Sequence, residues 1–495
     1  MLSLIIATVL AVFFLIKFFV KTKQFPPGPM PLPVIGNMFS IYWEGFGKGG
    51  IRPLLHRWKK EYGPVFTIWA GPMPLVSISD YDLAVETMVK KGQTFADRAY
   101  FYIQEINRQG RGIITSNGHH WLEQRRFALH TLRDFGLGRN LMEERIMLEY
   151  DYRTNILEKK ITEAGGRLRW DPRQFCELTV GNIINRMLFS ERFTDEKETE
   201  FFRMKKRMEE IMEKTSVVDG FLSETNRHWP LFNRRYLAMK GAEDMVLDFI
   251  RAQIEDKKRL LESGQGGDCE DFVQTYLTKM KTGEYSDEFN EEALLLSLFD
   301  LWIAGQESTA TTLQWGLAYL IRFPRTLKKL QAELDTTTGR NRHVSLKDRL
   351  NTPYLNAVVQ ETLRVGALLP FNVLARSTTE DIQIHGYTIP KGTAISAQLA
   401  VIMGEEKDFK DPYEFNPDRY LNGEPEQNVI AFGLGKRACP GESLARAELY
   451  MLIGNLALNF NMQAVSGQEP SMVAAQENVV IRKAQNYDMF ISKRE

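Results

Sequence analysis

One cysteine of this chain stands in a setting that favours chemistry. Cys439 comes after two closely spaced glycines, is followed by Pro440 and Gly441, and precedes a pattern over 443–460 that predicts a helix. Glycines let a backbone approach a flat ligand closely, and a cysteine just before a helix meets backbone N–H groups and the positive end of the helix dipole, which favour the thiolate. Such a thiolate suits one axial bond to an iron ion, whereas most isolated cysteines are small buried hydrophobes.

An acid and a hydroxyl lie side by side in the middle of a long apolar segment. Glu307 and Ser308 follow Gly305, and a glycine inside a helix costs about 1 kcal/mol relative to alanine. An acid beside a hydroxyl can pass protons to a bound reactant. The alternative is that Ser308 only donates a hydrogen bond back to the Ala304 carbonyl.

The segment that carries this pair is predicted to cross the whole molecule. Residues 290–322 predict a helix of about 50 Å, which opens with Glu291 and Glu292, closes before Pro324 and is too apolar at its centre for a surface helix. Other elements are predicted from periodicity: helices over 142–161 and 201–214, strands over 65–69 and 75–78, and a hairpin from 382–384 and 393–397 with its turn at 386–392.

The composition is that of a folded protein with balanced charge. The chain has 495 residues, 43% of them hydrophobic and 25% charged, which are ordinary globular values. Lys and Arg together number 63, as do Asp and Glu, and this balance argues against a nucleic-acid binder. Cys176, Cys269 and Cys439 are too far apart for a disulfide framework or a zinc site. We therefore expect the bulk of the chain in a reducing compartment.

The beginning of the chain predicts a membrane anchor. Residues 4–16 are apolar except for Thr8, and residues 18–20 extend the run past Lys17, to roughly the length of helix that spans a bilayer. Positive charges come at Lys17, Lys21 and Lys23 and none precedes the run, which favours an uncleaved anchor with its C-terminal side in the cytosol over a cleaved signal peptide.

A proline-rich stretch after the anchor predicts a stiff, extended arm. Charge and composition change little after it. We therefore expect a transmembrane signal anchor over 1–23, the arm over 24–35 and one catalytic domain over 36–495.

The cysteine loop and several other motifs resemble one known family. Phe432, Gly435, Arg437, Cys439 and Gly441 occupy every fixed position of Phe-x-x-Gly-x-Arg-x-Cys-x-Gly, which closely resembles the haem-binding signature of the cytochrome P450 family. Further motifs of that family recur in the same order along the chain: Trp121-x-x-x-Arg125, Ala304-Gly305-Gln306-Glu307-Ser308-Thr309, Glu361-x-x-Arg364 and Phe415-Asn-Pro-Asp-Arg419. The anchor and the arm are similar to those of microsomal members, and the whole pattern is most similar to the animal family 2 branch.

The resemblance implies a fold and a cofactor. The fold would be mainly α with a small β-rich subdomain (α+β), with the long central helix lying over the haem and the anchor preceding it. The cofactor would be haem b, iron protoporphyrin IX, with the Cys439 thiolate as the iron ligand and Phe432 packed beside it. Cytochromes P450 are the standard example of a thiolate whose donation favours O–O cleavage.

Two haem propionates require cationic partners, and planar guanidinium groups suit carboxylates. The resemblance assigns this role to Arg437, to Arg98 and Arg376, and to Trp121 with Arg125, which lie one turn apart on a helix. A solvated surface charge is the alternative for each arginine.

The remaining motif residues are implied to have structural and proton-transfer roles. Glu361 and Arg364 can pair at i,i+3 and would form, with Arg419, a buried ion-pair network that supports the cysteine loop.

In the central helix, Ala304 and Gly305 would lie against the haem where the helix opens locally for dioxygen and water. Glu307, Ser308 and Thr309 would deliver protons. The usual threonine of the family is replaced by Ser308, with Thr309 one residue later. Because serine lacks the methyl group that fixes a threonine rotamer, we expect oxygen activation to survive with some leakage to hydrogen peroxide.

The segments that would line the substrate pocket are mostly apolar, which suits a lipophilic substrate that enters from the membrane. A fatty acid, a steroid and a xenobiotic are all compatible with them. The apolar residues expected in the pocket are Phe101, Ile103, Ile113, Ile114, Leu368, Leu369, Phe371 and Val480.

Electrons must come from a partner because no G-x-G-x-x-G fingerprint is found. The resemblance implies NADPH–cytochrome P450 reductase, with cytochrome b5 as a further candidate, at the endoplasmic reticulum membrane. Arg126, Arg133 and Arg139 are expected to form a basic patch that attracts an acidic reductase.

The favoured function is a monooxygenase: RH, O2, two electrons and two protons give ROH and water. The alternatives are a reductase-independent isomerase or dehydratase of lipid hydroperoxides and a haem-binding sensor without turnover. Glu307 beside Ser308 favours the monooxygenase because an isomerase needs no proton relay.

Overall fold

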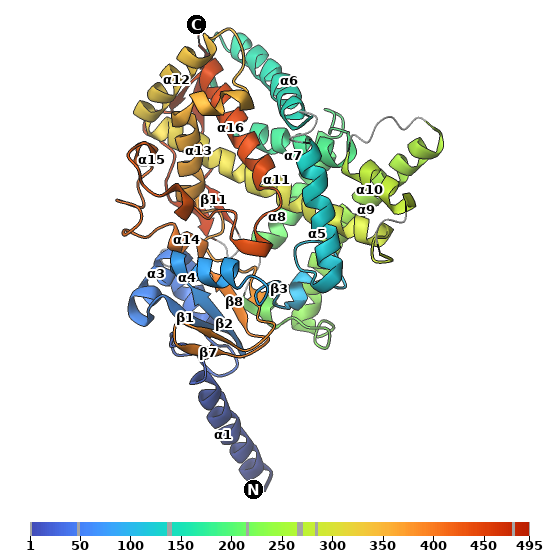
Figure 1. Ribbon diagram of the computed structural model, residues 1–495, viewed down its shortest axis with the longest axis vertical. Helices are drawn as coiled ribbons and strands as arrows, with labels where there is room; N and C mark the ends of the chain where they lie inside the picture. The colour runs from blue at the N-terminus through green and yellow to red at the C-terminus, as the bar shows by residue number, and fades with distance from the viewer. Residues whose placement is uncertain are drawn as a thin grey trace.

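The computed structural model describes residues 2–46, 50–135, 141–213, 217–264, 271–282, 286–477 and 481–494. A large helical part lies against a smaller part built on β-sheets, and the first helix extends away from both (Figure 1). The predicted fold class, mainly α with a small β-rich subdomain, is confirmed. Arg139, Cys269, Val480 and the end of the helix predicted over 201–214 lie outside the described residues.

The helices of the described residues vary from a single turn to more than thirty residues. They are α1 (Leu2–Thr22), α2 (Met38–Ser40), α3 (Ile51–Tyr62), α4 (Tyr81–Val85), α5 (Gly118–Arg133), α6 (Leu141–Glu163), α7 (Arg173–Phe189), α8 (Glu198–Glu213), α9 (Pro230–Glu262), α10 (Phe272–Thr282), α11 (Glu291–Arg322), α12 (Pro324–Thr338), α13 (Pro353–Gly366), α14 (Leu399–Ile402), α15 (Asp418–Leu421) and α16 (Glu442–Asn459).

The strands form small sheets. One sheet has the order β1 (Val65–Ala70), β2 (Met73–Ile78), β8 (Ala394–Ala397), β5 (Arg376–Ser377) and β3 (Asp97–Arg98). A second has the order β4 (Leu168–Trp170), β12 (Met489–Lys493) and β9 (Phe460–Ala464), and two pairs are β6 (Ile382–Ile384) with β7 (Tyr387–Ile389) and β10 (Ala474–Glu477) with β11 (Arg482–Ala484).

The long central helix α11 matches the prediction over 290–322. The Asn290 side chain accepts a hydrogen bond from the Ala293 amide at 3.0 Å, which caps the first turn. Gly305 lets α7 pack closely, because a Cβ there would lie 2.6 Å from Cδ1 of Ile184. The helix runs unbroken through Gly305, so the local opening expected there is absent, and tight packing explains the glycine.

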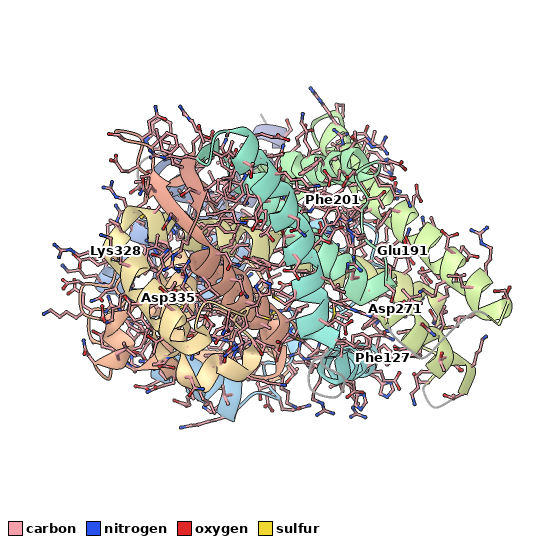
Figure 2. The ribbon with its side chains drawn as sticks, turned by 90° about the horizontal axis from the view of Figure 1, so that it is seen from above. Phe127, Glu191, Phe201, Asp271, Lys328 and Asp335 are labelled. Carbon is pink, nitrogen blue, oxygen red and sulfur yellow. The ribbon has the colours of Figure 1, made fainter. Side chains whose placement is uncertain are left out.

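Aromatic contacts join the helices on one side of this core. Phe127 of α5 packs edge-on against Phe272 and Tyr276 of α10, with ring centroids 5.1 and 5.0 Å apart. Figure 2 shows Phe127 and Asp271 on the same side of the molecule. Asp271 caps α10 by accepting from the Gln274 amide at 2.8 Å.

The prediction of one hairpin is wrong in its pairing. β6 pairs with β7 around His385 and Gly386, whose φ values are +47° and +83°, and not with residues 393–397. Two consecutive left-handed residues form the tight turn that matches the twist of a hairpin. β8 instead runs parallel to β2 in the larger sheet.

The first helix is the only one of the described ranges that is long and apolar enough to cross a membrane, over Ile5–Thr22. Its last turns contact the sheet: the ring of Phe18 is buried against Trp69 at 5.6 Å between centroids. The proline-rich arm then lies along β1, where the Thr67 hydroxyl donates to the Pro26 carbonyl at 2.8 Å. The arm is therefore docked on the sheet.

A buried ion-pair network holds the segment before the cysteine loop. Arg364 donates two hydrogen bonds of 2.8 Å to the Glu361 carboxylate, and Arg419 Nε donates to it at 3.0 Å. Tyr420 Oη donates to the same carboxylate at 2.8 Å. All three charged side chains have at most 2% of their surface exposed. Loss of one partner would leave an uncompensated charge in a dry site.

We therefore expect Arg364→Ala to lower the free energy of unfolding by about 3–5 kcal/mol. The control is Arg251→Ala, which removes the same side chain from an exposed i,i+3 pair with Asp248 at 2.7 Å and should cost less than about 1 kcal/mol. Urea unfolding of both variants measures the difference. Equal costs would contradict a supporting role for the buried network.

Candidate functional site

Backbone contacts fix the cysteine loop against the segment that precedes β3. The Cys439 amide donates to the Phe432 carbonyl at 2.8 Å. Gly435 has a φ of +63°, and a Cβ there would lie 1.8 Å from the Met88 carbonyl oxygen, so only glycine fits. The guanidinium of Arg446 lies 5.0 Å from the ring centroid of Phe432. These contacts hold Cys439 just before α16, as the glycine spacing predicted.

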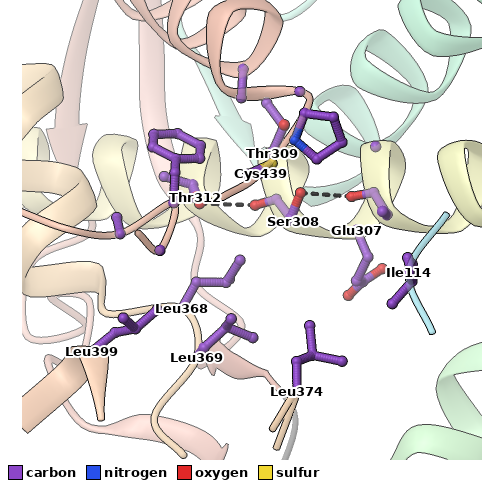
Figure 3. Close-up of a pocket in the computed structure, with 18 of the residues that line it drawn as sticks. Ile114, Glu307, Ser308, Thr309, Thr312, Leu368, Leu369, Leu374, Leu399 and Cys439 are labelled. Atoms are coloured by element: carbon purple, nitrogen blue, oxygen red, sulfur yellow. Dashed lines mark hydrogen bonds between the residues drawn. The ribbon is translucent and has the colours of Figure 1, made fainter. Parts of the chain in front are cut away.

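A cavity of about 400 Å³ separates this loop from α11. Cys439 is exposed, but its exposed surface faces this cavity and not bulk solvent. Figure 3 shows Leu368, Leu369 and Leu374 facing α11 across the open space. The walls are mostly apolar, so a lipophilic ligand would lose water and gain packing contacts there.

The structure divides the residues that were predicted to line a pocket. Ile113, Ile114, Leu368 and Leu369 line the cavity. Phe371 and its neighbour Phe101 belong to an apolar cluster beside the larger sheet, and Ile103 packs against α9. Phe371, Phe101 and Ile103 therefore pack in the apolar core and do not line the pocket, which is the alternative role for any apolar residue in these segments.

The thiol of Cys439 is neutral without a bound cation. Burial raises its pKa, and the Gly441 amide and the Arg125 guanidinium only partly oppose that effect. The expectation that the helix start alone favours the thiolate is therefore outweighed by desolvation. A metal ion would reverse the balance, because a coordinated thiol is deprotonated outright. The loop fits a metal that takes one soft ligand.

Four arginines gather at the edge of the same cavity, namely Arg98, Arg125, Arg376 and Arg437. Arg98 and Arg376 are directly paired across β3 and β5, an arrangement of like charges that destabilises a sheet. Burial lowers the pKa of Arg98, and the other three guanidiniums lower it further. Among the described residues, no carboxylate lies within ion-pair distance of any of them.

Carbonyl oxygens satisfy part of this cluster. Arg125 Nη2 donates to the Ala438 carbonyl at 2.5 Å, and Arg437 Nη2 donates to the Ser116 carbonyl at 2.8 Å. Arg437 Nη1 and Trp121 Nε1 remain buried without a partner, although the Trp121 ring stacks 3.7 Å from the Arg437 guanidinium. Unpartnered donors and uncompensated positive charge fit a ligand with two carboxylates. A haem group, flat and dianionic at its edge, meets this requirement together with Cys439.

The acid of the central helix is held between two lysines. Glu307 lies 2.5 Å from Lys205 Nζ of α8 and 2.9 Å from Lys483 Nζ of β11. Burial would raise its pKa, but the two ammonium groups more than offset burial and lower it to about 2. Glu307 is therefore ionised at neutral pH and can accept a proton but has none to donate.

The neighbouring hydroxyl makes a local contact. Ser308 Oγ donates to the Ala304 carbonyl at 2.7 Å, which is the alternative hydrogen bond that the sequence also allows (Figure 3 shows Ser308). Ser308, Ala304 and Gly305 all line the cavity. Thr309 also lines it but is buried on the side of α16. The three residues of the predicted relay therefore face one cavity in different directions.

A second buried acid on α11 fixes the loop over the cavity. Asp300 accepts from the amides of Ile113 and Ile114 at 2.8 and 2.9 Å and from Arg108 Nε at 3.1 Å. It is 1% exposed and lines the cavity. Sequence reasoning missed it, although an aspartate within an apolar helical run is itself a signal, because a buried charge needs partners.

Loss of one arginine of this cluster should have opposite effects on the haem-free and the haem-bound protein. We expect Arg125→Met to leave the free energy of unfolding of the haem-free protein unchanged or higher, because the substitution relieves repulsion between guanidinium groups. Transfer of haem from the variant to an acceptor globin should become about tenfold faster, because one charge-assisted hydrogen bond to the haem is lost. Arg126→Met, on the exposed next residue, is the control and should change neither. Equal haem transfer from the two variants would contradict the assignment.

Comparison with known proteins agrees with this geometry. A family model described as Cytochrome P450 matches residues 26–490. A probable cytochrome P450 cyp-35D1 of Caenorhabditis elegans is 37% identical, with 90% of this chain and 91% of that protein covered. Human cytochrome P450 2C8 and rabbit cytochrome P450 2C4 are each 33% identical, over 90% and 94% of this chain and 89% and 93% of their own lengths. The chain belongs to the cytochrome P450 family and is one of its haem-thiolate monooxygenases.

Proposed function

We propose that this enzyme inserts one oxygen atom of O2 into a neutral lipophilic substrate, with electrons from NADPH through a membrane-bound reductase. The observation that carries the proposal is that the Cys439 thiol and four arginines without a carboxylate partner among the described residues line one mostly apolar cavity beside α11. The overall reaction joins RH, O2, two electrons and two protons to give ROH and water.

We assign the cofactor contacts to residues around the cavity. Cys439 would be the iron ligand, and Phe432 and Arg446 would shield its sulfur on the side away from α11. The propionates would be held by Arg98, Arg125, Arg376 and Arg437 and by the free N–H group of Trp121. When bound, the haem supplies the binding and activation of dioxygen, and thiolate donation favours O–O cleavage.

Residues of α11 would handle protons on the side facing the substrate. Glu307, Ser308 and Thr309 stay the proposed relay, but the geometry changes the part of Glu307. Because Glu307 is ionised between Lys205 and Lys483, any proton that leaves this network starts on an ammonium nitrogen or on water. Ser308 would reach the reactant by rotating away from the Ala304 carbonyl.

The charges of the cavity favour a neutral substrate. Among the described lining residues outside the arginine cluster, the charged or carboxyl side chains are Asp300, Glu307 and Glu448, and Cys439 is the other titratable group. The nearby cations are already paired, Arg108 with Asp300 and Glu243, and Lys205 with Glu307. A carboxylate ligand would lose its water and find no unpaired cation outside the arginine cluster, which the haem propionates would occupy. Steroids, xenobiotics and fatty alcohols or esters are therefore favoured over free fatty acids.

Partners and location follow from the first helix and from α5. We assign α1 as an anchor in the endoplasmic reticulum membrane with the rest of the chain in the cytosol. Arg126 and Arg133 are exposed on α5, the helix that also carries Arg125. We assign them to the docking face for NADPH–cytochrome P450 reductase, with cytochrome b5 as a second candidate.

Reconstitution with substrates matched in length tests this proposal. With NADPH and reductase, we expect hydroxylated product from dodecan-1-ol and about tenfold less from dodecanoate at neutral pH, because an ionised carboxylate would be desolvated in an apolar cavity whose nearby cations are already paired. Product analysis by mass spectrometry measures both rates in the same membranes.

Omission of NADPH, of reductase, or of both provides the controls. Rearrangement of a lipid hydroperoxide without either would establish the isomerase, and tight binding of a ligand without product under any condition would establish a sensor. Faster turnover of dodecanoate than of dodecan-1-ol would contradict the neutral substrate class alone.

A further inference from the structure

A buried arginine lies directly behind the walls of the cavity. Arg482 begins β11 and has 4% of its surface exposed. Its neighbour Ile481 lines the cavity, whereas Arg482 lies behind it. A guanidinium taken out of water needs acceptors in its place, and backbone carbonyls supply them. One of these is the Met472 carbonyl, which accepts from Arg482 Nη2 at 2.8 Å.

The end of α13 supplies two further acceptors. Arg482 Nη1 donates to the carbonyls of Val365 and Gly366 at 3.2 and 3.0 Å. Both carbonyls belong to the last turn of α13, where no partner remains within the helix. A cation there also meets the negative end of the helix dipole. Ala367, with a φ of +39°, ends the helix. Arg482 therefore fixes the point at which the chain leaves α13.

The chain that leaves α13 forms one wall of the cavity. Residues 367–369, which we call the wall segment, all line the cavity. Leu368 and Leu369 of this segment face α11 across the open space (Figure 3). The Arg482 amide donates to the Leu368 carbonyl at 2.9 Å. The backbone of Arg482 therefore holds the wall segment itself, and its side chain holds the helix end from which the segment starts.

The same arginine contacts the opposite side of the cavity through α11. Trp315 of α11 is fully buried and lines the cavity. Its Nε1 donates to the Arg482 carbonyl at 3.0 Å, and the Arg482 guanidinium lies 4.2 Å from the centroid of its ring. A cation over a desolvated indole is a favourable contact. Arg482 thus links α11 to the wall segment and sets the spacing between them.

We propose that Arg482 is a positioning residue that fixes the wall segment relative to α11 and thereby decides which carbon of the substrate is oxidised. This role rests on the proposed function, because it concerns how that reaction selects among C–H bonds. A flexible lipophilic substrate offers many similar C–H bonds, and apolar walls choose among them by shape. A displacement of about 1 Å can change the rate at one position by about two orders of magnitude. Arg482 acts through Leu368, Leu369 and Trp315.

Substitution of Arg482 should change the site of oxidation more than the consumption of NADPH. Arg482→Met keeps an apolar stem without the donors. With dodecan-1-ol and reductase, we expect the ratio of the main hydroxylated regioisomer to the next one to fall by about tenfold. Arg482→Lys retains the charge but replaces a planar fork with a point donor, so it should recover only part of the ratio. Gas chromatography with mass spectrometry measures the regioisomers.

Arg494 provides a matched control away from the cavity. Arg494 Nη1 donates to the Leu458 carbonyl in the last turn of α16 at 2.9 Å, which is the same type of contact, and Nη2 pairs with Asp335 at 2.7 Å. Because Arg494→Met also loses this ion pair, it should lower the melting temperature by at least as much as Arg482→Met. The regioisomer ratio should stay that of the wild-type protein.

Hydrogen exchange of the haem-loaded full chain provides a readout that does not depend on turnover. Arg482→Met should speed amide exchange over residues 366–369 and 481–484 and leave the end of α16 unchanged. Arg494→Met should show the reverse pattern. Mass spectrometry of peptic peptides measures both variants against the wild-type protein.

Two results would overturn the proposal. One is a wild-type regioisomer ratio in Arg482→Met, or in Arg482→Lys if the Met variant does not fold. The other is an equal change of the ratio in Arg494→Met. Wild-type protein that makes no product with reductase would instead remove the proposed function. The exchange experiment still tests the contacts in that case, since unchanged exchange over 366–369 in the Arg482 variants would show that this side chain does not hold the wall segment.

Discussion

The positive charge collected at one edge of the cavity is the constraint on which the rest of this structure depends. Arg98 and Arg376 face each other across β3 and β5, and Arg125 and Arg437 approach from α5 and from the cysteine loop. Their guanidiniums stay protonated at any physiological pH, so the fold maintains repulsion that only a bound anion relieves. A haem with its two propionates provides that anion, and its binding would contribute to folding free energy.

The elements around the cavity are arranged to hold this site. The unbroken helix α11 packs against α7 at Gly305 and forms one wall, and Asp300 on it fixes the loop that carries Ile113 and Ile114. On the other side, the network of Glu361 holds the segment that leads into the cysteine loop. Buried charged side chains therefore occur where loops must be held in a defined position. At such sites the buried charges fix the position of the loop more than they add to the net stability of the fold.

Much of the fold could be predicted from local sequence patterns. The features that were not predicted depend on how segments pair in the folded structure. The limits of α11 follow from Asn290, the acidic first turn and Pro324, which are all local signals. The pairing of β6 with β7 was hidden because Tyr387 to Ile389 lay inside an expected turn. The lysines on Glu307 come from elements more than one hundred residues away in either direction along the sequence, and no local pattern indicates such partners. The protonation state of the predicted relay could therefore be read only from the assembled structure.

The bond from the Cys439 sulfur to iron is the central claim, and the carbon monoxide complex of the reduced, haem-loaded protein tests it most directly. A thiolate ligand gives that complex the long-wavelength Soret band that distinguishes it from complexes with a histidine ligand, and we expect this band in the wild-type protein and its loss in Cys439→Ala, with Cys176→Ala unchanged. A folded, haem-loaded wild-type protein without the band, or a Cys439→Ala variant that retains it, would contradict the account.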